Sequence, residues 1–288
     1  MDRAHRKQAA GKRIKYFWNR KRKTLLYTGL ALSYLFAVLL AGLCINPQSY
    51  GVNFGEVFAP PGKMHIFGTD YMGRDMFFRS VKGLSNSLVI GIFASVVSSC
   101  MALAFGAAAA LKGGWIDRLV NWCTDLCMGI PHLILLILIS FLMGRGAKGV
   151  SFAVALTHWP ELTRLVRAEV LQVCSAQYVQ ASYQMGKDRL WVAREHILPH
   201  VLPVYLIGVV LLFPHAIMHE AAITFLGFGF SPETPAIGVI LSESMNYLAT
   251  GKWWMALFPG LLLLFAVIMF EVVGENLKRL LNPATGNE

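Results

Sequence analysis

Long apolar runs alternate with short polar or charged segments along this chain. A helix needs about 20 apolar residues to cross the hydrocarbon core of a bilayer, and several of the runs reach that length. The pattern predicts six transmembrane helices, at about residues 25–45, 88–111, 119–143, 149–171, 201–222 and 253–273. The expected fold class is therefore all-α and integral to a membrane.

Two of these predicted helices are irregular. Pro131 lies within the third run and predicts a kink, because proline lacks an N–H and crowds the preceding turn. The fourth run is apolar only in its first half, and its second half carries four charged side chains, Glu161, Arg164, Arg167 and Glu169. We expect protein or water, rather than lipid, to surround these charges.

Composition and charge agree with a polytopic membrane protein. The 288 residues are 56% hydrophobic and only 15% charged, whereas soluble domains of this size carry more charge. The net charge of +10 is concentrated near the amino terminus, where residues 3–23 contain ten Lys or Arg and only Asp2 precedes them as an acid. Beside a transmembrane helix, such a segment is typical of a cytoplasmic anchor, and we expect no nucleic-acid partner.

This charge distribution also predicts the orientation and the division of the chain. With the amino terminus inside, six crossings return the carboxyl terminus to the cytoplasm. The expected parts are a basic cytoplasmic segment (1–24), a first transmembrane helix (25–45), an extracytoplasmic segment (46–86), a transmembrane domain (87–279) with a cytoplasmic loop at 176–199, and a cytoplasmic tail (280–288).

A polar segment at 180–199 separates the fourth and fifth apolar runs and is rich in helix-forming residues. Its charges place it outside the bilayer. Leu190 and Trp191 would give such a helix an apolar face. On these residues alone, the helix either rests on lipid headgroups or docks on a partner protein.

The spacing within 180–199 resembles the cytoplasmic "EAA" loop of ABC-importer permeases. That pattern is EAA, three residues, Gly, nine residues, Ile, one residue and Leu-Pro, and the positions that match it here are Gln180, Ala181, Ser182, Gly186, Leu198 and Pro199. The chain departs from the pattern where Gln180 replaces the acid and His196 replaces the isoleucine. The resemblance implies that these six residues belong to a coupling helix seated in a groove of an ATPase subunit.

Other motifs are similar to those of the C-type permeases of dipeptide, oligopeptide and nickel importers. They are Gly-Thr-Asp-x-x-Gly-Arg-Asp at 68–75, Phe-Leu-Gly-Phe-Gly at 225–229 and Val-Gly-Glu-Asn-Leu-Lys-Arg-Leu-Leu-Asn-Pro at 273–283. The resemblance covers about 66–283 and departs at Ile237, where these permeases often have Trp. It implies a multi-pass inner-membrane subunit that works with a second, homologous permease, two ATPase subunits and an extracytoplasmic substrate-binding protein.

The first of these motifs also predicts local structure. Asp70 followed by Gly73 suits a tight turn, because Asp bonds its own downstream backbone and Gly accepts a positive φ. Arg74 lies between Asp70 and Asp75, and we expect local salt bridges among them.

Two histidines are the candidate metal ligands. His215 and His219 lie at i, i+4 in the fifth run and therefore share one helix face. Paired imidazoles suit Ni²⁺, Cu²⁺ or Zn²⁺, although buried histidines also bond between helices. Glu220 is turned about 100° away and is not an obvious third ligand.

The HxxxH pair resembles the C-type permease of nickel importers. The resemblance implies transient contact with Ni²⁺ and a cargo of nickel or a nickel chelate. A dipeptide, oligopeptide or metallophore cargo remains an alternative.

Catalytic motifs are absent from the sequence. It contains no Gly-x-x-x-x-Gly-Lys-Ser/Thr phosphate loop, no HExxH and no Gly-x-Ser-x-Gly. We therefore expect a chain that is not an enzyme and holds no cofactor, with ATP and Mg²⁺ bound by partner subunits. An ion-coupled secondary transporter that uses Glu220 and the histidines as proton sites is the alternative of a different class. The lack of an inverted repeat disfavours it.

Overall fold

The computed structural model describes the backbone of residues 2–281 and the side chains of residues 22–281. Most of the basic segment's side chains, and residues 282–288 of the expected tail, lie outside the described part. Within it the regular structure is helical, apart from an isolated bridge between Thr69 and Asp75. The all-α expectation is confirmed.

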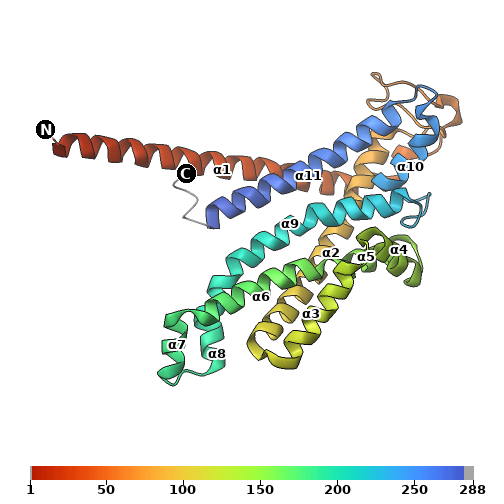
Figure 1. Cartoon of the computed structure of the whole chain (residues 1–288). Coiled ribbons are helices and arrows are strands. Elements are labelled where there is room, and N and C mark those ends of the chain that lie inside the picture. The colour runs from red at the N-terminus through yellow and green to blue at the C-terminus, as the bar shows by residue number, and fades with distance from the viewer. Residues whose placement is uncertain (1, 282–288) are drawn as a thin grey trace.

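The helices follow one another with short connections (Figure 1). They are α1 (Asp2–Cys44), the 3₁₀ turns η1 (Pro47–Tyr50) and η2 (Phe54–Glu56), α2 (Met76–Lys112), α3 (Gly114–Gly129), α4 (His132–Leu142), α5 (Gly146–Thr157), α6 (Trp159–Ser175), α7 (Gln177–Gln184), α8 (Arg189–Val192), the π-helical turn η3 (Ala193–Ile197), α9 (Leu198–Phe225), α10 (Ile237–Leu248) and α11 (Trp254–Leu281).

Four helical stretches among the described residues are long and apolar enough to cross a membrane: Arg22–Cys44, Met76–Lys112, Arg189–Phe225 and Trp254–Leu281. A fifth is present if α3 and α4, which meet at a 99° bend, count as one broken span. The expectation of six is not confirmed. The run at 149–171 forms α5 and α6 instead, of 12 and 17 residues, and neither is a candidate span alone.

Prolines account for both interruptions. Pro131 forces Ile130 into an extended conformation (φ −89°, ψ 135°), so the predicted kink is a complete break between α3 and α4. Pro160 occupies the first turn of α6, where its missing N–H costs nothing, and His158 both ends α5 and begins α6. The sequence thus predicted the first interruption, as a kink, but not the second.

α2 is the centre of the bundle and packs against α1, α5, α6 and α9. Two of its glycines permit close approach. A Cβ at Gly91 would lie 2.5 Å from Cγ1 of Ile217 in α9, and one at Gly106 would lie 2.8 Å from the Thr163 carbonyl in α6. The two helices that follow and precede the 180–199 segment are therefore held directly on the central helix.

The 180–199 segment and the segment between α1 and α2 lie far apart (Figure 1). α7 and α8 protrude at one end, and α10 lies with the segment between α1 and α2 at the other. The amino end of α1 and the carboxyl end of α11 lie toward the α7–α8 side. This arrangement is the one expected if 46–86 and 180–199 emerge on opposite sides of a membrane.

The turn at 68–75 is a fixed structure. Asp70 is fully buried, and its Oδ1 accepts hydrogen bonds from the backbone N–H groups of Met72 and Arg74 at 2.8 and 3.0 Å. Gly73 has φ +71°, and a Cβ there would lie 1.8 Å from the Asn53 carbonyl oxygen. The predicted tight turn is confirmed, and only glycine fits at position 73.

The salt bridges around this turn differ in part from the expectation. Arg74 pairs with Asp70 as expected, at 2.6 Å. Asp75 instead caps α2 and contacts His65 at 2.7 Å. Arg79 of α2 and Glu243 of α10 complete the network, because Arg79 Nη1 lies 3.0 Å from Asp70 and 2.6 Å from Glu243. The network ties the segment between α1 and α2 to α2 and α10, a long-range link that local sequence did not reveal.

Candidate functional site

The predicted coupling segment forms a helical hairpin. α7 ends at Gln184 and is followed by Gly186, whose φ of +81° is in the left-handed region and whose N–H bonds the Tyr183 carbonyl at 3.0 Å. Asp188 then caps α8 by accepting the Trp191 N–H at 3.1 Å. Leu198 and Pro199 open α9. The segment is therefore a compact unit between α6 and α9.

The hairpin has a buried side and an exposed side. Val179, Val192 and Ile197 are buried together with the carboxyl-terminal half of α6. Met185 and Leu190 are 73% and 77% exposed. Exposed apolar side chains at a protruding hairpin are typical of a protein-docking surface.

The structure gives physical roles to the two departures from the EAA pattern. Gln180 Nε2 donates to the Cys174 carbonyl at 2.7 Å and thereby ties α7 to the end of α6. His196 Nε2 lies 3.0 Å from the hydroxyl of Ser182, which is buried. Its ring packs against those of Tyr178 and Trp191. His196 thus joins α7 and α8 through a hydrogen bond and through ring contacts. An apolar residue at this position would join them by packing alone.

The two histidines predicted as a metal pair have different surroundings. His219 Nδ1 bonds the backbone carbonyl of His215 at 2.9 Å, and the His215 ring is exposed. His219 instead meets two histidines from other helices, His132 and His158. Glu220 points elsewhere, is fully buried and accepts a hydrogen bond from Thr224.

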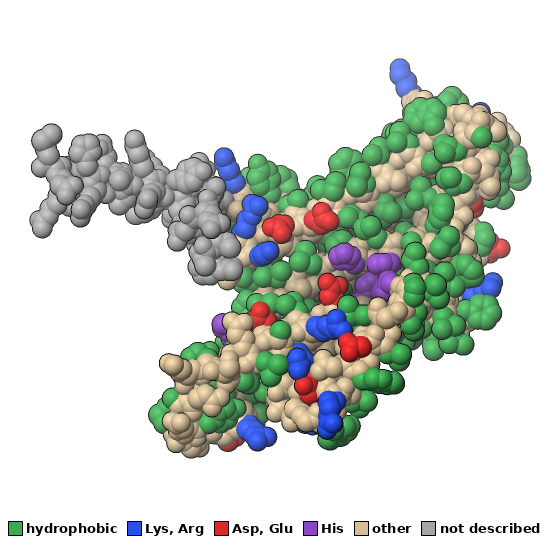
Figure 2. All heavy atoms as spheres, viewed as in Figure 1, with side chains coloured by type: hydrophobic (Ala, Val, Ile, Leu, Met, Phe, Trp, Pro, Cys, Tyr) green, Lys and Arg blue, Asp and Glu red, His purple; other side chains and the backbone are tan. Residues whose placement is uncertain are grey.

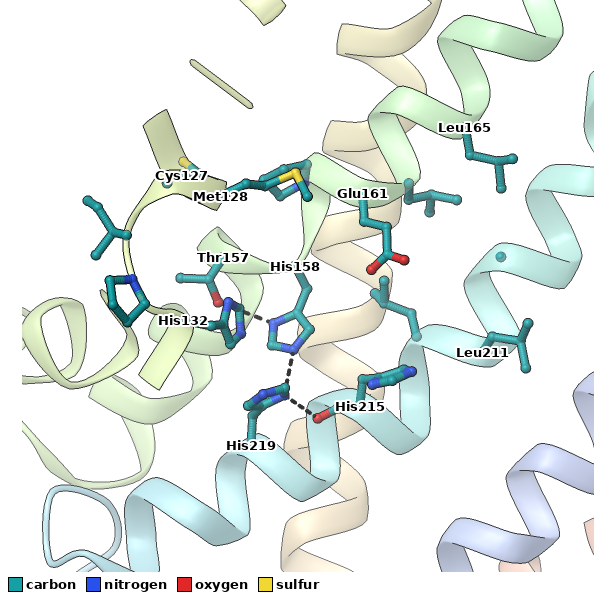
Figure 3. A pocket seen from close by; sticks show the side chains of 17 residues that line it. Cys127, Met128, His132, Thr157, His158, Glu161, Leu165, Leu211, His215 and His219 are labelled. Atoms are coloured by element: carbon teal, nitrogen blue, oxygen red, sulfur yellow. Dashed lines mark hydrogen bonds between the residues drawn. The ribbon is translucent and has the colours of Figure 1, made fainter. Parts of the chain in front are cut away.

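The three histidines form a compact cluster (Figure 3). One ring nitrogen from each of His132, His158 and His219 lies within 4.8 Å of the others. His158 Nε2 is 3.2 Å from His219 Nδ1, and the ring centroid of His132 is 4.4 Å from that of His219. His132 begins α4, His158 lies at the α5–α6 junction and His219 is within α9.

The cluster lines a cavity of about 920 Å³ between α3, α6 and α9. His215 and Glu161 also line this cavity, together with apolar residues that include Leu165 and Leu211. Figure 2 shows histidine side chains gathered in a hollow on one face of the molecule. Both predicted histidines therefore line the cavity, but only His219 belongs to the cluster.

Sequence reasoning missed His132 and His158 as ligand candidates because each is the only histidine of its apolar run. The sequence signal that could have identified them is their position within two residues of a proline, Pro131 or Pro160. Helix breaks are where side chains from separate segments converge on a cavity.

Comparison with known proteins agrees with the fold. Residues 102–287 match the family described as the binding-protein-dependent transport system inner membrane component. The dipeptide transport system permease protein DppC of Bacillus subtilis (strain 168) is 32% identical over 92% of this chain and 84% of its own length. A putative peptide transport system permease protein of Brucella suis biovar 1 is 32% identical over 92% of this chain and 88% of its own.

Solved transporters share the architecture. An inward-facing structure of the MetNI methionine ABC transporter has a TM-score of 0.61 at 17% identity and covers 72% of this chain and 98% of that one. A crystal structure of an amino acid ABC transporter with histidines has a TM-score of 0.56 at 16% identity, over 68% and 91% of the two chains.

These matches confirm the expectation of an ABC permease, whereas the two relatives are named for peptides and not for nickel. The chain belongs to the family of inner membrane components of binding-protein-dependent transport systems, as a multi-pass permease subunit of an ABC transporter.

Proposed function

We propose that this permease forms half of the translocation path of an ATP-driven importer whose cargo is nickel or a nickel chelate. The observation that supports this proposal is the cavity, which His132, His158, His215 and His219 all line. Neutral imidazoles are good ligands for borderline divalent cations. A peptide carrier needs hydrogen-bond partners and apolar contacts for its cargo but has no need for four imidazoles.

In this proposal, movement of the 180–199 segment changes the shape of the cavity. It joins the carboxyl end of α6 to the beginning of α9, and both helices contribute cavity walls through Glu161, Leu165, His215 and His219. Two ATPase subunits that close on ATP would push on the exposed side of the hairpin. Because Val173, Val179, Val192 and Val201 share one buried cluster, the hairpin and both helices should shift together.

The remaining partners follow from the family. An extracytoplasmic binding protein would deliver the cargo to the outer end, and a companion permease would cover the open side of the cavity. ATP and Mg²⁺ would bind the ATPase subunits, and both termini of this chain would lie in the cytoplasm.

A small peptide is the second candidate cargo. The relatives named for dipeptides and peptides favour it, and about 920 Å³ is within the range of cavities that hold small organic ligands. The Glu161 carboxylate in this cavity would suit a peptide's amino group. The family membership leaves no support for the secondary-transporter alternative.

Reconstitution separates these cargoes. The importer would be assembled in vesicles from this chain, its companion permease, its ATPases and its binding protein. ATP-dependent uptake would be measured with nickel, nickel–histidine and dipeptides. We expect uptake of nickel or nickel–histidine, and uptake of dipeptides alone would reject the nickel proposal in favour of the peptide alternative.

A further inference from the structure

We propose that His132, His158 and His219 form a binding site for a single borderline divalent cation, and that the sequence-adjacent pair His215 and His219 does not. The inference deepens the proposed function, since it supplies the site at which a metal cargo would be held. It stands on three features: the convergence of the rings, the tautomers that backbone hydrogen bonds set, and the unpartnered buried nitrogen of His132.

The rings converge from separate elements. Two of them lie at helix breaks, His132 at the start of α4 and His158 at the start of α6, and the third is on α9. All three pairs of rings are in contact, with centroids 4.4 to 5.1 Å apart. Ligand nitrogens around a tetrahedral ion with bonds of about 2.1 Å lie about 3.4 Å apart. Nitrogens within 4.8 Å of one another reach that spacing by small side-chain rotations.

Backbone hydrogen bonds determine which ring nitrogens of His158 and His219 carry lone pairs. The Val154 carbonyl can only accept, so His158 Nδ1 donates to it at 2.8 Å and Nε2 carries the lone pair. In the same way His219 Nδ1 donates to the His215 carbonyl at 2.9 Å, so Nε2 of His219 carries no proton. The same Nδ1 lies 3.2 Å from the lone pair of His158 Nε2, a contact that a bound cation would replace. A backbone carbonyl that fixes the tautomer is the usual outer partner of a metal-binding histidine.

The third imidazole also has a ring nitrogen that is available to a metal. His132 Nε2 is buried and has no hydrogen-bond partner among the described residues. A histidine kept only to bond neighbouring helices would place that nitrogen against a donor or acceptor, because an unpaired buried polar atom destabilises the fold. A cation between the three rings would satisfy it.

The class of ion follows from the donors. Three neutral nitrogens with no thiolate favour Ni²⁺, Cu²⁺, Zn²⁺ or Co²⁺ over Mg²⁺ and Ca²⁺, which prefer oxygen. Three protein ligands leave at least one position open to the cavity, where water or a donor atom of a chelating molecule would bind. An open position allows exchange, which a transport site requires.

His215 is the matched control for His219. Both are on α9 and both line the cavity, yet only His219 is within the cluster. The conservative variants are His132→Gln, His219→Gln and His215→Gln, each of which keeps a polar side chain of similar length.

The test is binding of Co²⁺ to the assembled importer in detergent, with affinity tags removed. Visible absorption would report nitrogen ligands and titration would give the affinity. We expect one saturable site per copy of this chain. Affinity should fall at least about tenfold in His132→Gln and His219→Gln, and by less than about threefold in His215→Gln. Thermal unfolding without metal would show that the variants are folded.

Two results would overturn the site. One is the absence of saturable binding in the unmodified importer, and the other is an equal loss of affinity in His215→Gln and His219→Gln. The outcome is separable from the proposed function, because binding is measured without transport. Metal binding together with uptake of dipeptides alone would support the site and reject the nickel cargo. Nickel uptake without this binding would support the nickel cargo and reject the site.

Discussion

Replacing Gly186 with valine tests whether the hairpin couples this chain to ATPase subunits. Gly186 has φ +81°, and a Cβ built there has no atom within 4 Å. The substitution therefore creates no clash, and its cost is the left-handed backbone strain of an L-residue, about 1–2 kcal/mol. A cost of this size lowers the ratio of native to non-native turn about 5- to 30-fold without unfolding a chain whose stability is about 5–15 kcal/mol.

The turn at Gly186 sets the position of α8 relative to α7, since the Lys187 N–H also bonds the Ser182 carbonyl at 3.1 Å. A shifted turn would change the exposed surface that carries Met185 and Leu190. We expect the variant importer to retain less ATPase during purification and to lose most ATP-dependent uptake. Co-purification, uptake in vesicles and thermal unfolding in detergent are the three measurements.

Gly251→Val is the control for Gly186→Val. Gly251 has φ +82° and also has no atom within 4 Å of its ideal Cβ, but it lies after α10 at the opposite end of the molecule. The two variants should lose similar stability, and only Gly186→Val should lose ATPase binding. If Gly186→Val retains its ATPases and transports normally despite the same loss of stability, the coupling assignment is wrong.

Three further predictions concern buried or paired side chains. Asp70→Asn should destabilise the chain by about 3 kcal/mol in thermal unfolding, because it leaves Arg79 buried with one acid fewer. His65 bonds Asp75, which raises the pKa of this histidine. The stabilisation from this pairing should be complete below about pH 6.5 and lost as pH rises through the raised pKa of His65. It would be measured as the difference in unfolding free energy from His65→Gln. Ser182→Ala should cost about 1 kcal/mol more beside His196 than beside His196→Ile, where it removes only the bond from Ser182 Oγ to the Tyr178 carbonyl.

Each of these three predictions has a contradicting outcome. Glu233→Gln removes an exposed acid between α9 and α10, and a loss equal to that of Asp70→Asn would mean that the buried network adds no stability. A stability difference for His65→Gln that does not change with pH would contradict the charged pairing with Asp75. Equal costs of Ser182→Ala in both backgrounds would show that the 3.0 Å contact with His196 contributes nothing.

The sequence predicted most of what depends on local physics. Apolar runs located the long helices, Pro131 located a bend, and the Asp70–Gly73 turn formed as expected. The i, i+4 rule predicted that His215 and His219 share a helix face, and both line the cavity. These features depend on residues close together in the chain, for which periodicity and turn chemistry are sufficient.

The features that the sequence did not predict depend on contacts between segments that are distant in the chain. The 99° bend at Pro131 brings α4 back so that His132 meets His219, a separation of almost ninety positions that no helical period encodes. The break at His158 likewise divides an apolar run that has the length of a span. Glu243 reaches Arg79 from α10 for the same reason. Local patterns specify which residues share a face, and only packing specifies what that face meets.

α6 and α9 connect the histidine cluster to the α7–α8 hairpin. α6 begins beside His158 and ends at the hairpin, and its 17 residues span about 25 Å. α9 starts at the hairpin and carries His219. A tilt of about 3° between two rigid helices of this length moves their far ends by about 1.3 Å, whereas a metal–nitrogen bond tolerates about 0.2 Å. Small movements of the hairpin are therefore sufficient to open the 3.2 Å contact between His158 and His219, so the affinity for a bound cation should depend on the nucleotide state of the ATPases.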